Sequence, residues 1–184
     1  MLYIKRVVIL LIILTVSLFL WMDQQQKRMN LGSVATIPQP GYTAPNFQLN
    51  KISYPMETIT LSDLTLTEKN GVILYFWTSW CPFCSASMEA LQHSFQTYGD
   101  EIHFVGINVT KQDSISEATK FLEKHQIHFE NVMDIEGTVS GSYYVPPIPA
   151  TIFINSEGII THRKVGAITV IEIEQSIAQM KRGN

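Results

Sequence analysis

The chain has 184 residues, of which 46% are hydrophobic, and a formal net charge of −3. This charge and the lack of a basic stripe exclude nucleic acid as an expected partner. The two cysteines share one motif, which excludes a small secreted fold held together by several disulfides. The length allows one N-terminal anchor and one globular domain.

The N-terminal segment has the pattern of a membrane anchor. Lys5 and Arg6 precede an apolar run, residues 7–22, which together with residues 2–4 approaches the ~20 residues that a bilayer-spanning helix requires. Small residues of the kind found at signal-peptide cleavage sites are missing directly after the run. We therefore predict that residues 1–22 form an uncleaved signal anchor, with a cleaved signal peptide as the alternative.

A tether and a single domain follow the anchor. Residues 23–40 are polar and then contain glycine and proline, with no hydrophobic period, which indicates a linker. Residues 41–184 are the predicted domain. Its first part, residues 41–59, contains two short extended runs that predict a β-hairpin.

The centre of the domain is predicted to be a strand that leads into a helix. Residues 72–77, VILYFW, form an apolar run typical of a strand buried on both faces. After Thr78 and Ser79, apolar residues recur at helical spacing up to Tyr98. Cys81 should therefore lie on or just before the first helical turn, and Cys84 one turn further into the helix.

The rest of the chain alternates between strands and helices. Further strands are predicted at residues 101–109, 131–134, 150–155 and 159–165, the last two forming a hairpin. A short helix is predicted at residues 136–144. Two longer helices are predicted to begin at capping boxes, Ser114–Glu117 and Thr169–Glu172. This alternation predicts an α/β fold.

The two cysteines have the spacing and context of a redox-active dithiol. Free backbone N–H groups and the positive end of the helix dipole favour a thiolate at Cys81, and the thiolate is the nucleophile. Pro82 suits the first helical turn, where its missing N–H costs nothing. Cys81 should be exposed, and Cys84 should be more buried. We expect Cys81 to attack a disulfide and Cys84 to release the resulting mixed disulfide.

Other uses of the cysteine pair fit the sequence less well. A zinc site requires two more ligands, and the five histidines show no paired spacing. A c-type haem site requires histidine directly after the second cysteine, where Ser85 stands. A purely structural disulfide across so short a loop would contribute little stability. We therefore predict no metal and no cofactor.

Two motifs, YFWTSWCPFC and PPIPATIFINSEG, resemble those of the thioredoxin superfamily, and more narrowly of membrane-anchored TlpA/ResA-like thiol-disulfide oxidoreductases. The resemblance covers about residues 41–181. It implies a thioredoxin fold with an N-terminal β-hairpin extension and a central βα insert, preceded by one transmembrane helix. It also implies a single-pass protein of a bacterial cell membrane, with its C-terminal domain on the extracytoplasmic side.

The resemblance further assigns residues that face the cysteines. It places the superfamily's cis-proline at Pro149, opposite Cys81, where the backbone of Ile148 would pair with an extended substrate segment. An ordinary proline at the start of a strand is the alternative. With Trp80, Pro82 and Phe83 these are the candidate substrate-binding residues. Phe83 could equally be exposed or fold against the helix.

The chain departs from the resembled family at two acidic positions. Thioredoxins carry a buried aspartate in the central strand, where this chain has Tyr75, and ResA-like proteins carry a glutamate where it has Ser87. Either acid would help to move a proton at Cys84. Glu89 is the remaining candidate for proton transfer, although helical spacing favours a solvent-facing side chain.

The resemblance implies a reductase that keeps disulfides of specific proteins open, for example in cytochrome c maturation or in envelope and spore-coat assembly. Its partners would be disulfide-containing proteins, a membrane thiol that donates electrons, and the bilayer around residues 7–22. A disulfide oxidase or isomerase and a non-catalytic peptide-binding module are the alternatives. A peroxidase of the peroxiredoxin type is a more distant one, because Trp-Cys-Pro-Phe-Cys is not their arrangement.

Overall fold

The computed structural model describes residues 6, 14–18, 38–145 and 147–182. The chain divides into two compact units, Met1–Thr36 and Ile37–Asn184. In the first unit, residues 6 and 14–18 are helical and exposed. Residues 38–40 of the predicted tether are described as part of the second unit, and the rest of the anchor and tether lies outside the described residues. Within those residues, no helix is long and apolar enough to span a bilayer.

The second unit is built on a five-stranded sheet in the order β5-β4-β3-β6-β7. The central strand β3 runs parallel to β4, and β4 runs parallel to β5. Strand β6 is antiparallel to β3, and β7 is antiparallel to β6, as predicted for a hairpin. The bounds are β3 Gly71–Trp77, β4 His103–Asn108, β5 Glu130–Met133, β6 Ala150–Asn155 and β7 Ile160–Val165.

All seven residues of β3 are buried, as the apolar run predicts for a strand covered on both faces. Alternate side chains point to opposite faces, because successive residues of a strand do so. Ile73, Tyr75 and Trp77 belong to one hydrophobic cluster, which also contains Cys81 and Cys84. The intervening residues of β3 belong to a second cluster on the other face.

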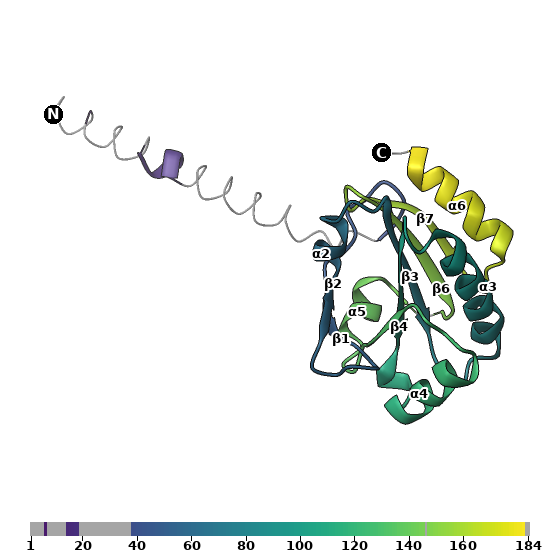
Figure 1. The fold of residues 1–184 in the computed structure, drawn as a ribbon. Coiled ribbons are helices and arrows are strands. Elements are labelled where there is room, and N and C mark those ends of the chain that lie inside the picture. Colours follow the sequence, from purple (N-terminus) through teal and green to yellow (C-terminus); the bar gives the residue numbers. More distant parts are fainter. Residues whose placement is uncertain (1–5, 7–13, 19–37, 146, 183–184) are drawn as a thin grey trace. The chain divides into compact units, whose positions relative to one another are not determined.

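Helices cover both faces of this sheet (Figure 1). Helices α3 (Pro82–Tyr98), α4 (Ile115–Lys124) and α6 (Val170–Arg182) contribute to the cluster that holds the cysteines. Helices α2 (Leu61–Thr65) and α5 (Thr138–Ser142) contribute to the other cluster. A short 3-10 helix, η1 (Thr110–Gln112), connects β4 to α4.

The predicted N-terminal extension is a two-stranded antiparallel hairpin, β1 (Gln48–Asn50) and β2 (Thr58–Thr60). It lies beside β5, where Lys51 bridges to Val132 and the Ile52 N–H donates to the Asn131 carbonyl at 2.8 Å. The predicted insert, with its strand β5, lies between β4 and β6. The extension therefore covers the edge of the sheet that the insert provides.

Both capping boxes mark helix starts, as predicted. The Ser114 hydroxyl accepts a hydrogen bond from the Glu117 N–H at 3.2 Å at the start of α4. At the start of α6, Thr169 and Glu172 bond reciprocally, with the Thr169 N–H donating to the Glu172 carboxylate at 2.9 Å. Both helices begin at the edge of the sheet where β3 and β4 end and β6 begins, which we call the carboxyl edge.

Candidate active site

The turn that carries Cys81 follows directly from the end of β3 at the carboxyl edge. We call residues 78–81 the Cys81 turn. Cys81 is the N-cap of α3, with extended backbone angles (φ −82°, ψ 114°), and Pro82 is the first helical residue. The Cys84 N–H donates to the Cys81 carbonyl at 3.0 Å. This confirms the prediction that Cys81 lies just before the first helical turn.

The two cysteines, both free thiols, differ in accessibility. Cys84 is fully buried, as predicted, and Cys81 keeps 5% of its surface exposed. The expectation of a well-exposed Cys81 is wrong in degree, because its side chain belongs to the buried cluster while its neighbours project outward. Trp80 is 58% exposed and Phe83 is 68% exposed. Of the two alternatives for Phe83, the structure therefore shows an exposed side chain and not one folded against the helix.

Burial raises the pKa of the Cys84 thiol well above its ordinary value, and a hydrogen bond with Cys81 raises it further. The same hydrogen bond places the two sulfur atoms next to each other. Cys84 is therefore a neutral thiol in the reduced protein at physiological pH. This matches the predicted contrast, in which Cys84 is the poorer nucleophile of the pair.

The two positions where the resembled family carries acids lie together behind Cys84. The Tyr75 hydroxyl donates to the Cys84 carbonyl at 3.0 Å, and burial raises the Tyr75 pKa far above its ordinary value. The Ser87 hydroxyl donates to the Phe83 carbonyl at 3.1 Å and accepts from the Ile168 N–H at 3.2 Å. Neutral hydroxyl groups therefore occupy the space behind Cys84.

Glu89 lies on the exposed side of α3, with 66% of its side chain accessible. Its carboxylate lies 3.3 Å from the His125 Nδ1 atom on α4. None of the contacts that Cys84 makes with described residues involves Glu89. The structure thus places Glu89 where helical spacing favoured it, facing solvent, and does not bring it to the cysteines.

The Ile148–Pro149 peptide bond is cis, as the resemblance implied. Pro149 is buried directly before β6, and Ala150 pairs with Phe76, so Pro149 lies beside the end of β3. Ile148 is half-buried against the hydrophobic cluster that contains both cysteines. Among the described residues, none hydrogen-bonds to the Ile148 backbone. The segment therefore offers free backbone groups at the carboxyl edge.

Two further residues at this edge were not identified from the sequence. The Asp113 carboxylate accepts hydrogen bonds from Ser79, and the Gln112 carbonyl accepts one from the Trp80 indole. Both contacts cross more than thirty positions of the chain. Asp113 stands directly before a capping box, so its position in the sequence suggests only the approach to a helix.

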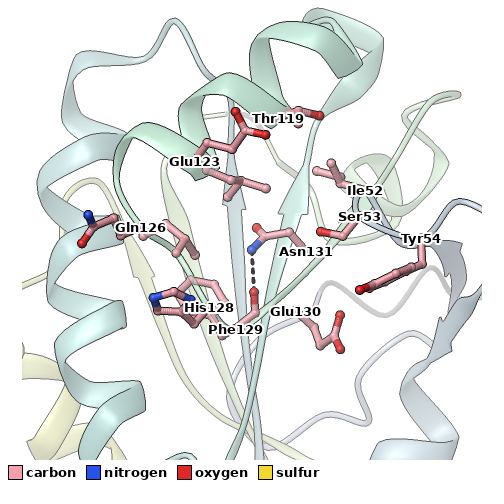
Figure 2. Close-up of a pocket in the computed structure, with 12 residues that line it drawn as sticks. Ile52, Ser53, Tyr54, Thr119, Glu123, Gln126, His128, Phe129, Glu130 and Asn131 are labelled. Carbon is pink, nitrogen blue, oxygen red and sulfur yellow. Dashed lines mark hydrogen bonds between the residues drawn. The ribbon is translucent and has the colours of Figure 1, made fainter.

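A hollow of about 650 Å³ lies elsewhere, and none of the predicted site residues lines it. Figure 2 shows α4 residues such as Glu123 on one side of it and the hairpin residues Ser53 and Tyr54 on another. Across the described part of the chain, no group of three or more His, Cys, Asp or Glu side chains could hold a metal ion.

Comparisons with known proteins agree with this geometry. The model of the AhpC/TSA family matches residues 40–163. The thiol-disulfide oxidoreductase ResA of Oceanobacillus iheyensis is 31% identical over 148 residues, which cover 79% of this chain and 74% of ResA. Sporulation thiol-disulfide oxidoreductase A of Bacillus subtilis is 25% identical over 150 residues, which cover 80% of this chain and 91% of that protein.

Solved structures show the same fold. A secreted Mycobacterium tuberculosis disulfide oxidoreductase homologous to Escherichia coli DsbE superposes with a TM-score of 0.60 at 25% identity, covering 72% of this chain and 94% of that one. StoA of Bacillus subtilis is similar in fold, with a TM-score of 0.61 at 24% identity, covering 73% of this chain and 97% of StoA. The chain therefore belongs to the AhpC/TSA family, has a thioredoxin-like fold and is a thiol-disulfide oxidoreductase.

Proposed function

We propose that the chain is a membrane-tethered, extracytoplasmic reductase in which Cys81 attacks disulfides of specific proteins and Cys84 resolves the product. The observation that carries this proposal is the pair of free, adjacent thiols of unequal accessibility at the start of α3. The Cys81 thiol lies at the amide-rich end of the helix, where a thiolate is favoured. The Cys84 thiol lies within hydrogen-bond distance of it.

The first step is attack by the Cys81 thiolate on one sulfur of a substrate disulfide. A bond forms between Cys81 Sγ and that sulfur, the substrate S–S bond breaks, and the other substrate sulfur leaves as a thiolate that takes up a proton from water. The product is a mixed disulfide between Cys81 and the substrate.

The second step releases the substrate. Cys84 loses its proton to water and attacks Cys81 Sγ, which forms the Cys81–Cys84 disulfide and frees the second substrate thiolate, which is then protonated. The substrate gains two electrons, which the enzyme loses, and takes up two protons from water, while Cys84 releases one proton to water. The raised pKa of Cys84 delays this step, because only its thiolate can attack. A membrane thiol that donates two electrons would return the pair to the reduced state.

The electrostatics of Cys84 favour the reducing direction. A dithiol is a strong oxidant when its reduced form is stabilised, and a stabilised thiolate provides such stabilisation. Burial of Cys84 has the opposite effect on its thiolate and outweighs the hydrogen bond from Tyr75, which lowers the Cys84 pKa. We therefore propose that the pair is poised toward reduction of its partners.

The substrate would bind as an extended segment across the carboxyl edge. Ile148 has free backbone groups there, so it can hydrogen-bond to a substrate strand, with Pro149 holding the segment beside β3. Trp80, Pro82 and Phe83 are exposed around the accessible thiol and would contact substrate side chains.

The predicted anchor and the relatives support the proposed compartment and substrates. One relative is named a sporulation oxidoreductase and a similar structure is described as secreted, which supports an extracytoplasmic site of action. Apocytochrome c and envelope or spore proteins are the proposed substrates. The bilayer would hold residues 7–22.

The in-cell redox state of Cys81 and Cys84 tests the proposed direction. Growing cells are quenched with acid, and free thiols are labelled with a reagent that adds mass. A pair that is mostly reduced is expected. A pair that is mostly oxidised would contradict the reductase and support a disulfide oxidase or isomerase. A Cys81→Ser variant that keeps full biological activity would instead support a non-catalytic binding module.

Fractionation of cells tests the tether. The full chain should sediment with membranes, resist extraction with alkaline carbonate, and be degraded by protease added to cells whose outer layers have been removed. A variant that lacks residues 1–22 should not sediment with membranes. A full chain in the soluble fraction, or one that the protease cannot reach, would contradict the proposed location.

A further inference from the structure

We infer that Asp113 is a positioning residue that fixes the Cys81 turn for attack on a disulfide. This inference rests on the proposed function of Cys81. Asp113 lies between η1 and α4, 34 positions from Ser79 in the sequence, and contacts the turn at the carboxyl edge.

The Asp113 carboxylate accepts four hydrogen bonds from three segments of the chain. From the Cys81 turn, Ser79 donates twice at 2.6 Å, through its N–H to Oδ2 and through its hydroxyl to Oδ1. From the end of β4, the Asn108 amide donates to Oδ2 at 2.8 Å. From the start of α4, the Ser114 N–H donates to Oδ1 at 2.8 Å. One carboxylate thus ties the turn to a strand and a helix.

The residue next to Asp113 provides a second attachment. The Trp80 indole Nε1 donates to the Gln112 carbonyl at 2.8 Å, although the Trp80 side chain is 58% exposed. Two successive residues of the turn, Ser79 and Trp80, are therefore bound to two successive residues of the neighbouring loop. An exposed aromatic ring that is held in one orientation loses little further freedom when a partner binds.

The turn has few other restraints of this kind. The Thr78 hydroxyl is buried and has no hydrogen-bond partner among the described residues. The Cys81 N–H reaches the Thr78 carbonyl only at 3.4 Å. Among the described residues, the contacts that tie the turn to a neighbouring loop are thus those to Asp113 and Gln112, beside the contacts of Thr78 and Cys81 with Cys84.

Asp113 is charged under physiological conditions. Burial alone would raise its pKa, but the hydrogen bonds from Ser79, Asn108 and Ser114 outweigh burial and hold the pKa below its ordinary value. Hydrogen bonds to an ionised acceptor are roughly twice as strong as those between neutral groups. Each of the two hydrogen bonds that Ser79 donates is therefore stronger than an ordinary hydrogen bond between neutral groups.

A fixed turn matters because sulfur attack is directional. A substrate segment that docks on the carboxyl edge must meet the Cys81 sulfur in line with its own S–S bond. Misplacement of a reacting group by about 1 Å can reduce the rate by about a hundredfold. A small alkylating reagent has no such docking requirement and approaches the thiolate from any open side.

Asp113→Asn is the test variant. An amide has one oxygen, so at least two of the four donors lose their acceptor while the shape of the side chain is kept. The matched control is Glu117→Gln, which removes the same charge from an exposed residue of α4 whose carboxylate pairs with Lys120 at 2.7 Å. Ser79→Ala is a milder variant, because it removes only the hydroxyl bond to Oδ1.

The experiment uses the reduced full-length chain and two reagents. One is a synthetic peptide closed by a disulfide, and the other is iodoacetamide. Mass spectrometry reports the second-order rate constant at Cys81 for each, between about pH 6 and pH 9, where Asp113 is ionised. The readout is the ratio of the two rate constants. Alkylation of Cys84, which is buried in the folded chain, reports partial unfolding separately, so the ratio is compared only among variants in which Cys84 stays protected.

We expect Asp113→Asn to lower the ratio about ten- to a hundredfold at every pH, with Ser79→Ala intermediate and Glu117→Gln within about twofold of the wild-type chain. Alkylation of the buried Cys84 would reveal an unfolded Asp113→Asn chain, in which case Ser79→Ala decides. An unchanged ratio in the folded variants would overturn the inference alone. A wild-type chain that does not react with the peptide disulfide would overturn the proposed function as well.

Discussion

The carboxyl edge and the hollow beside the hairpin stand at opposite ends of the parallel strands. The Cys81 turn follows the end of β3, whereas residues 127–131, which line the hollow, precede and begin β5 (Figure 2). The hollow has a volume of about 650 Å³, yet neither thiol lines it. A hollow of this size therefore does not mark the reacting site in this protein.

The difference between the two regions has a chemical reason. Enclosing pockets suit small ligands, which must be surrounded to be bound tightly. A disulfide within another protein is presented by a polypeptide, which an enclosing pocket cannot admit. It needs an accessible sulfur, exposed apolar side chains such as Trp80 and Phe83, and free backbone groups, all of which meet at the carboxyl edge.

The largest expected contrast between the regions comes from Cys81→Ser. This substitution should abolish reduction of a peptide disulfide, because a hydroxyl group is not ionised at neutral pH and cannot replace the thiolate. A change in the hollow, Glu123→Gln, should leave the rate within about twofold of the wild-type rate, since an exposed surface substitution is usually neutral. Residual activity in Cys81→Ser, or a large loss in Glu123→Gln, would reverse the assignment of the two regions.

Gly106→Ala should show that the packing around Asn131, which lines the hollow, supports the fold and not the chemistry. An added Cβ would lie 1.9 Å from the Asn131 Oδ1 atom, which accepts a hydrogen bond from the buried Trp77 indole at 3.0 Å. Overpacking and loss of this bond should lower the free energy of unfolding by roughly 2–4 kcal/mol.

Urea denaturation measures this loss of stability. The folded Gly106→Ala chain should still react with disulfides at the wild-type rate under conditions where it is native. A stable variant with slow thiol exchange would assign part of the chemistry to the region around the hollow.

Alkaline pH should destabilise the reduced protein through Cys84. The unfolded chain releases the Cys84 proton near the ordinary pKa of 9.0, while the folded chain retains it to higher pH. Because the unfolded state binds fewer protons in this interval, the free energy of unfolding falls as pH rises through it. Below this interval the contribution is fully present.

Urea denaturation at a series of alkaline pH values measures the slope. A Cys84→Ser variant should show a smaller decrease in stability than the wild-type chain. Tyr75 is also buried with a raised pKa, so it accounts for part of the remaining decrease in both proteins. Equal slopes would mean that Cys84 titrates alike in the folded and unfolded states.

The smallest effect is expected for Glu89→Gln. The carboxylate is exposed and contacts His125 rather than the cysteines. Stability should change by less than about 0.5 kcal/mol, and the pH profile of disulfide reduction should coincide with that of the wild-type chain. A pH profile of the Glu89→Gln variant that is shifted from that of the wild-type chain would indicate that Glu89 transfers the proton at Cys84.

Local patterns in the sequence predict much of the fold. The apolar run of residues 72–77, the repeat that follows it and the two capping boxes each lie within a short stretch of chain, and each corresponds to an observed element. The position of Cys81 at the start of α3 follows from the same patterns. The cis bond before Pro149 came from the family resemblance.

Contacts between distant segments could not be predicted in this way. The hydrogen bonds between Ser79 and Asp113, and the approach of Gly106 to Asn131, depend on which strands become neighbours. The low exposure of Cys81 has the same origin, because it results from packing within a cluster built from several elements. Periodicity reports which side of an element is buried and not which partner covers it.

Trapping with a Cys84→Ser variant tests the division of labour between the two sulfurs most directly. Without the resolving thiol, Cys81 should accumulate mixed disulfides with partner proteins in membranes, which mass spectrometry can locate on Cys81 and which dithiothreitol releases. Recovery of Cys84→Ser without such adducts, while Cys81→Ser forms them through Cys84, would contradict the account.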